Sequence, residues 1–106
     1  MASFVLWYTG GGTPQGEAEQ AAVMQAWTAW FERLGAAVVD PGNPFTPAAR
    51  SIASNGAVAD VPAAAMAGGY SIIRAESLAA AVALAQSCPQ LQAGGQVTVY
   101  ETFPVM

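Results

Sequence analysis

The last third of the chain, residues 68–106, constrains the fold more than any other segment. It holds a β-forming run at Tyr70–Arg74, a helix-capping Ser77, an alanine-rich run that stops before Pro89, and a second β-forming run at Gln96–Glu101. Proline ends a helix because its ring blocks the next backbone hydrogen bond. This order predicts a strand, a capped helix and another strand.

The N-terminal part predicts a second unit of the same kind. Ser3–Thr9 is rich in β-forming residues and runs into three glycines, so it predicts a strand. In Thr13-Pro14, the threonine is a typical N-cap and the proline suits the first position of a helix. The helical spacing ends at Gly35, and Ala36–Asp40 predicts a short strand.

Apolar residues recur at helical spacing in both predicted helices, which predicts an inner face for each. In the first helix they are Val23, Trp27, Trp30, Phe31 and Leu34. In the second helix they are Leu78, Val82 and Ala85. We interpret Trp27 and Trp30 as core residues; the alternative is a stacking platform for a ligand.

The middle of the chain, residues 43–68, is the least regular part. Asn55-Gly56 lies between two apolar runs and predicts a β-hairpin. Before it, Asp40–Asn43 carries proline and then glycine at its centre, which predicts a type II turn. We therefore expect one α+β domain over residues 1–106, a ferredoxin-like βαββαβ fold with an inserted hairpin and both helices on one side of the sheet.

The strand sequences are too apolar for a sheet that is covered on one face only. Phe4 and Val5 fall on opposite faces of the first strand, as do Ile72 and Ile73 in the third. The chain is 54% hydrophobic and only 9% charged. Because two helices can cover a single face, we expect a homodimer in which the sheets of two subunits face each other.

The charged residues exclude several classes of function. The chain has three arginines, no lysine and no histidine, with a formal net charge of −4. Such a chain cannot form a basic patch for nucleic acid or for an anionic membrane surface. No apolar run approaches the roughly 20 residues of a membrane span. One cysteine and no histidine leave no usual zinc site, so we expect no metal and no cofactor. Because a single cysteine cannot form an internal disulfide, we also expect a cytoplasmic protein.

Several segments, in order along the chain, resemble the YCII-related proteins, in the branch named for an Asp-Gly-Pro-Phe motif within the dimeric α+β barrel superfamily. They are Leu6–Gly11, Trp27–Gly35, Val38–Pro44 and Gly68–Met106. The resemblance implies a ferredoxin-like dimer and a small-molecule enzyme that uses a histidine–aspartate pair. Here Asp60-Val61-Pro62-Ala63 stands at the branch motif, and Gln90 stands where relatives often have histidine.

A cavity edged by polar residues is the expected site. The candidate ligand-binding residues are Tyr8, Asn43, Arg50, Asp60, Ser71 and Tyr100. Asp40 is the candidate catalytic acid or base, since it ends a strand beside a turn. The alternative is that its carboxylate bonds the backbone of its own turn. Arg50 could clamp a carboxylate ligand, although such arginines more often pair with a nearby acid.

Two functions are compatible with these residues. The first is a module that binds a small apolar or carboxylate-bearing molecule in a cavity of the dimer. The alternative is a cofactor-independent isomerase, lyase or hydrolase that uses a carboxylate as acid or base. The absence of histidine favours the first function slightly, and whether the chain is an enzyme stays open. We interpret Cys88 as a small buried apolar side chain.

Overall fold

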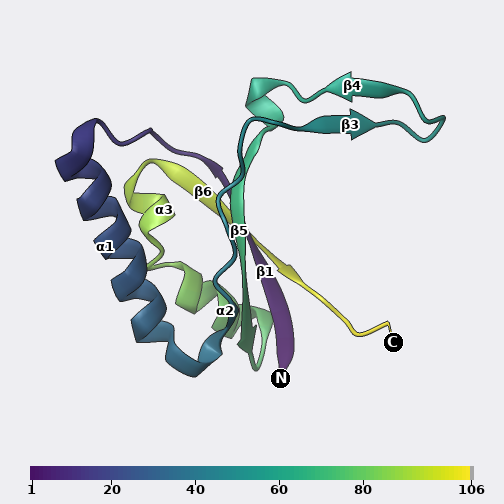
Figure 1. The fold of residues 1–106 in the computed structure, drawn as a ribbon. Coiled ribbons are helices and arrows are strands. Elements are labelled where there is room, and N and C mark those ends of the chain that lie inside the picture. Colours follow the sequence, from purple (N-terminus) through teal and green to yellow (C-terminus); the bar gives the residue numbers. More distant parts are fainter. Residues whose placement is uncertain (106) are drawn as a thin grey trace.

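A computed structural model describes residues 1–105, which form strands and helices in the order β1-α1-β2-β3-β4-β5-α2-α3-β6 (Figure 1). The strands are β1 (Ala2–Gly10), β2 (Val38–Asp40), β3 (Arg50–Ile52), β4 (Val58–Asp60), β5 (Ala67–Ala75) and β6 (Gly95–Glu101). The α-helices are α1 (Gly16–Leu34), α2 (Leu78–Ala85) and α3 (Pro89–Gln92). Single 3-10 turns cover Gly35–Ala37 and Ala63–Ala65.

The main sheet has the strand order β2-β5-β1-β6, and every neighbouring pair is antiparallel. The three α-helices lie on one side of this sheet (Figure 1). Strands β3 and β4, which lie between β2 and β5 along the chain, form a separate two-stranded sheet. The predicted α+β, ferredoxin-like architecture with an inserted hairpin is therefore confirmed.

The core lies between the sheet and the helices. From β1, Phe4, Leu6 and Tyr8 point to the helix side and are buried, and from α1 Trp30 is fully buried. The indole nitrogen of Trp30 donates to Ser87 Oγ at 3.1 Å, so the ring is buried without an unsatisfied polar atom. The interpretation of Trp30 as a core residue is confirmed.

Helix α1 begins later than its sequence predicts. Its N-cap is Gln15, which makes no side-chain capping bond, and not Thr13. The backbone N–H of Gly12 donates to Ala93 O at 3.1 Å, and this bond ties the loop to the end of α3. The chain then needs Gly16, at φ +79°, to turn into the helix.

The buried stripe of α2 also differs from the prediction. Ser77 caps the helix as expected, accepting a hydrogen bond from the Ala80 N–H at 3.1 Å. However, the buried residues are Ala81 and Ala85, whereas Leu78 and Val82 are 47% and 38% exposed. Alanines on the inner face let the helix backbone approach the sheet closely, so the larger side chains lie outside.

Helix α3 was not predicted, because the sequence analysis treated Pro89 only as the end of α2. Proline also suits the first turn of a new helix, since its missing N–H has no partner there in any case. The short α3 packs against β6 and α1. It places Gln90 beside the end of β1.

The β3–β4 hairpin, here called the arm, projects from the sheet on the side away from the helices (Figure 1). Its turn is the predicted Asn-Gly: the Gly56 N–H donates to Ala53 O, and Asn55 Oδ1 accepts from the Ala57 N–H. Gly56 has φ +88°, a conformation that glycine adopts without strain.

Candidate functional site

A half-open pocket of about 430 Å³ lies between α1, the loop after β2 and strand β5. The side chains from α1 are mostly apolar, and those from β1, β5 and α3 are polar at their tips. The lining residues are Tyr8, Val23, Met24, Trp27, Thr28, Phe31, Pro41, Gly42, Asn43, Pro44, Gly68, Tyr70, Ser71 and Gln90. The volume is within the usual range for small-molecule sites.

The loop after β2 forms one wall, and Asp40 forms a hydrogen bond within its turn. The Asp40 carboxylate accepts a hydrogen bond from the Gly42 N–H at 2.9 Å. Gly42 has φ +73°, as a type II turn requires at that position. A Cβ atom on Gly42 would also overlap the carbonyl oxygen of Tyr70, so only glycine fits between the loop and β5.

A chain of hydroxyl groups runs along the pocket wall. The Tyr8 hydroxyl donates to Ser71 Oγ at 2.8 Å, and Ser71 Oγ donates to the carbonyl oxygen of Pro41 at 2.7 Å. Ser71 is fully buried. Burial raises the pKa of the Tyr8 phenol far above its ordinary value, so the hydroxyl keeps its proton at physiological pH.

Gln90 fastens the end of β1 to α3. Its Nε2 donates to the carbonyl oxygens of Thr9 at 2.9 Å and Gly10 at 3.1 Å. A Cβ atom on Gly95 would overlap the Gln90 amide group and would also lie only 2.9 Å from the backbone carbonyl oxygen of Thr9, so the neighbouring strand needs glycine at this point. Gln90 is thus a structural clamp that also lines the pocket.

Cys88 lies behind the pocket wall, next to Tyr8. It is only 1% exposed, which agrees with its interpretation as a small buried side chain. Burial raises the pKa of the Cys88 thiol to about 11. The thiol is therefore protonated at neutral pH and unreactive as a nucleophile.

The structure brings together three of the predicted site residues. Tyr8, Asn43 and Ser71 all line the pocket. Asp40 lies beside it, with a carboxylate oxygen engaged by its own turn. This contact is the alternative that the sequence analysis left open for Asp40. Tyr100 is 55% exposed and, paired with Val5, lies on the opposite face of the sheet.

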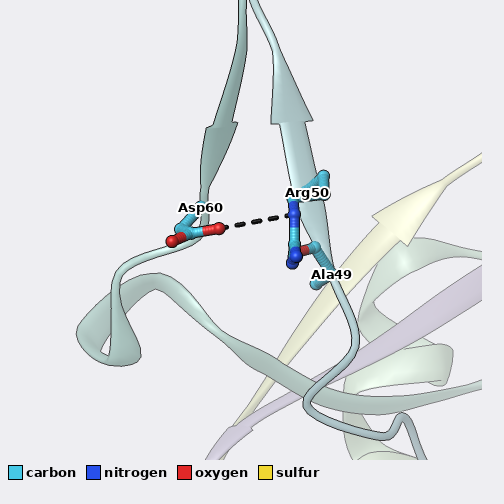
Figure 2. A network of polar contacts seen from close by, with 3 residues as sticks. All are labelled: Ala49, Arg50 and Asp60. Carbon is cyan, nitrogen blue, oxygen red and sulfur yellow. Dashed lines mark hydrogen bonds and ion pairs between the residues drawn. The ribbon is translucent and has the colours of Figure 1, made fainter.

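Arg50 and Asp60 lie on the arm, away from the pocket. Figure 2 shows them as a cross-strand pair, with Arg50 Nε 3.4 Å from Asp60 Oδ1. Arg50 Nη1 also donates to the carbonyl oxygen of Ala49 at 2.7 Å. Their side chains are 63% and 88% exposed, so the pair contributes little stability. Arg50 therefore pairs with a nearby acid, which is the alternative to binding a carboxylate ligand.

Sequence reasoning missed most of the contribution of α1, apart from the alternative that Trp27 offers a surface to a ligand. Met24, Thr28 and Phe31 line the pocket from this helix, together with Trp27. Their spacing places them along one side of the helix. That spacing was visible in the sequence, but it cannot distinguish residues that fill a core from residues that border a hollow.

The pocket is uncharged. Among residues 1–105, its lining includes no aspartate, glutamate, lysine or arginine. The same part of the chain contains no cluster of three acidic or cysteine side chains that could hold a metal ion. No helix within it is long and apolar enough to cross a lipid bilayer.

The fold and the pocket together define an α+β protein of ferredoxin-like topology, with a hollow between its sheet and its first helix. The family model described as YCII-related domain matches residues 4–105. The chain belongs to this family. No curated protein matches the chain significantly.

Proposed function

We infer that this protein binds a small, uncharged and largely apolar molecule in the pocket between α1 and β5. The observation that carries this proposal is the pocket lining, which combines apolar and aromatic side chains with a few polar atoms and no charge. Trp27 meets Tyr8 edge-on, with ring centroids 5.1 Å apart, a favourable arrangement of two aromatic rings in the pocket wall. This composition is typical of small-molecule sites.

Binding fits the pocket better than catalysis does. General acid–base chemistry needs a group whose pKa lies near the working pH. The pKa values of Tyr8 and Cys88 are both raised by burial, away from neutrality. Asp40, the expected carboxylate, does not line the pocket. A carboxylate-bearing ligand would also lack a partner, since Arg50 lies on the arm.

The same proposal includes a homodimer formed through the uncovered face of the sheet. We call this the open face and define it by Val5, Trp7, Tyr70, Ile72, Thr98 and Tyr100, which follow one another in the strand register. No helix lies over this face of the sheet (Figure 1). A second copy seated there would bury the large apolar side chains of this face and would also meet the arm, which projects on that side.

The arm supports this arrangement, because it has one apolar face of its own. Ile52 and Val58 are directly paired across its two strands and are 70% and 64% exposed. A two-stranded hairpin is marginally stable in water unless it packs on something. In the proposed dimer, this apolar pair packs on the partner subunit.

The pocket is tested by filling it. Thr28→Trp places a large ring in the pocket from an exposed position on α1, and Gln25→Trp places the same ring on α1 outside the lining. With indole as the probe, calorimetry should detect binding to the wild type and to Gln25→Trp, and at least tenfold weaker binding to Thr28→Trp. Equal affinity in all three proteins, or no binding to the wild type, would contradict the proposed site.

A further inference from the structure

The polar atoms of the pocket face it mainly as hydrogen-bond acceptors. Tyr8, Ser71, Thr28 and Gln90 all line the pocket. Each polar hydrogen on these side chains is already donated within the protein. Tyr8 donates to Ser71, Ser71 to Pro41 O, Thr28 to Met24 O at 2.9 Å, and Gln90 to Thr9 O and Gly10 O.

The directions of these bonds are fixed by the carbonyl groups at their ends. A backbone carbonyl only accepts, so Ser71 and Thr28 must each donate to the carbonyl beside them. Because the Ser71 hydrogen is used in this way, Ser71 must accept from Tyr8. The Gln90 amide must likewise turn its nitrogen to the carbonyls of Thr9 and Gly10, since its oxygen would be repelled there.

What remains for a ligand is a set of lone pairs, on Tyr8 Oη, Thr28 Oγ1 and the Gln90 side-chain oxygen. Asn43, exposed at the mouth, can donate or accept. Tyr70 also lines the pocket, but its side chain is on the open face beside Trp7, where its ring stacks on Phe45 with centroids 5.8 Å apart and an interplanar angle of 25°.

We propose that the pocket selects neutral apolar molecules that carry a hydrogen-bond donor, such as an N–H heterocycle or an alcohol, over isosteres that can only accept. This inference rests on the proposed binding function and specifies the chemistry of its ligand. An acceptor-only ligand would lose the hydrogen bonds its polar atom makes to water and find few donors in the pocket. An anion would meet lone pairs without a compensating charge.

Indole and benzofuran provide a matched test, because they differ mainly in an N–H group against an oxygen atom. Nuclear magnetic resonance titrations of the wild-type protein should show indole binding about 3- to 10-fold more tightly than benzofuran, the ratio expected for one net hydrogen bond. Indole-3-carboxylate should bind more weakly than indole. Equal affinity for the two neutral probes, or tighter binding of the carboxylate, would overturn the inference.

Ser71→Ala provides a second test within the same titration. Without Ser71 Oγ, the Tyr8 hydrogen loses its acceptor and becomes available to a ligand, so the preference for indole should fall to about 2-fold or less. Tyr100→Phe, which removes a phenol on the open face, is the control and should keep the wild-type ratio. An unchanged ratio in a folded Ser71→Ala protein would overturn the inference. If that variant does not fold, the ratio of indole to benzofuran affinity in the wild-type protein alone tests the inference.

The two proposals fail differently. If indole and benzofuran bind in the pocket with equal affinity, the binding function stands and the donor selectivity is wrong. If neither probe shifts any signal of a residue that lines the pocket, the proposed function is wrong, and the selectivity falls with it.

Discussion

The two faces of the main sheet are made by alternate residues of the same strands, yet they have different surroundings. Phe4, Leu6 and Tyr8 of β1 are buried under the helices, whereas the intervening Trp7 is 36% exposed. The side chains of the covered face are buried within one subunit, and this face borders the pocket. The open face holds apolar side chains that one subunit does not cover.

Aromatic rings on the open face also contact one another. The ring of Trp7 lies 5.4 Å from that of Phe45, which in turn stacks on Tyr70. Trp7, Phe45 and Arg50 border a second hollow at the base of the arm. This hollow has a charged side chain on its rim, unlike the pocket on the covered face. These differences support the proposals that the ligand binds on the covered face and that a second subunit packs on the open face.

The largest expected effect contrasts two tryptophans. Trp30→Ala removes a fully buried ring from the covered face and should lower the free energy of unfolding by about 3–5 kcal/mol. Trp7→Ala, on the open face, should cost less than about 2 kcal/mol when measured at protein concentrations where subunits are dissociated. Urea unfolding measures both. Similar losses for the two variants would break the distinction between the faces.

A charge on the open face should act on association. Ile72→Asp would place an unpaired carboxylate in the proposed dimer contact, at a cost of about 3 kcal/mol or more, and so raise the dissociation constant at least 100-fold. Sedimentation velocity compares it with Val82→Asp on exposed α2, which should leave the dimer unchanged. A wild-type protein that stays monomeric at micromolar concentration would contradict the dimer.

Alkaline pH should weaken the covered face selectively. Burial raises the pKa of Cys88 from 9.0 to about 11, so the folded state retains a proton that the unfolded state has lost. This contribution to stability is complete below pH 9 and is lost as the pH rises to 11, by about 2–3 kcal/mol. Cys88→Ala should flatten this part of the stability curve in urea unfolding, and an unchanged slope would contradict the assignment.

The smallest expected effect concerns Asp40. Asp40→Ala removes the hydrogen bond to the Gly42 N–H and should cost about 1 kcal/mol in thermal or urea unfolding. Indole affinity should change less than threefold, because the Asp40 side chain does not line the pocket. A loss of binding without a loss of stability would return Asp40 to the role that the sequence first suggested.

The fold was predictable because its signals are local. Asn55-Gly56 specifies a hairpin, Ser77 caps a helix, and alternation along the strands separates the faces of the sheet. The start of α1 was not predictable from Thr13-Pro14, because a contact between Gly12 and the distant Ala93 holds that loop.

The site was less predictable than the fold. Tyr8, Asn43 and Ser71, which the sequence offered as candidates, do line the pocket. Arg50 and Asp60 were placed near them because sequence spacing does not reveal that the hairpin projects away from the body (Figure 1). In the sequence, Gln90 stands out only as the residue in place of a histidine. Its structural role was not predictable, because its hydrogen bonds to Thr9 and Gly10 join residues far apart in the chain.

The three tryptophan side chains offer the most direct measurement of the central claim, that the ligand binds on the covered face. Their indole N–H signals can be followed in a nitrogen-15 spectrum while benzofuran or unlabelled indole is added. Trp27 lines the pocket and its signal should shift most. Trp7, on the open face, should be nearly unchanged. A large shift of Trp7 with an unchanged Trp27 would place the ligand on the wrong face and contradict the account.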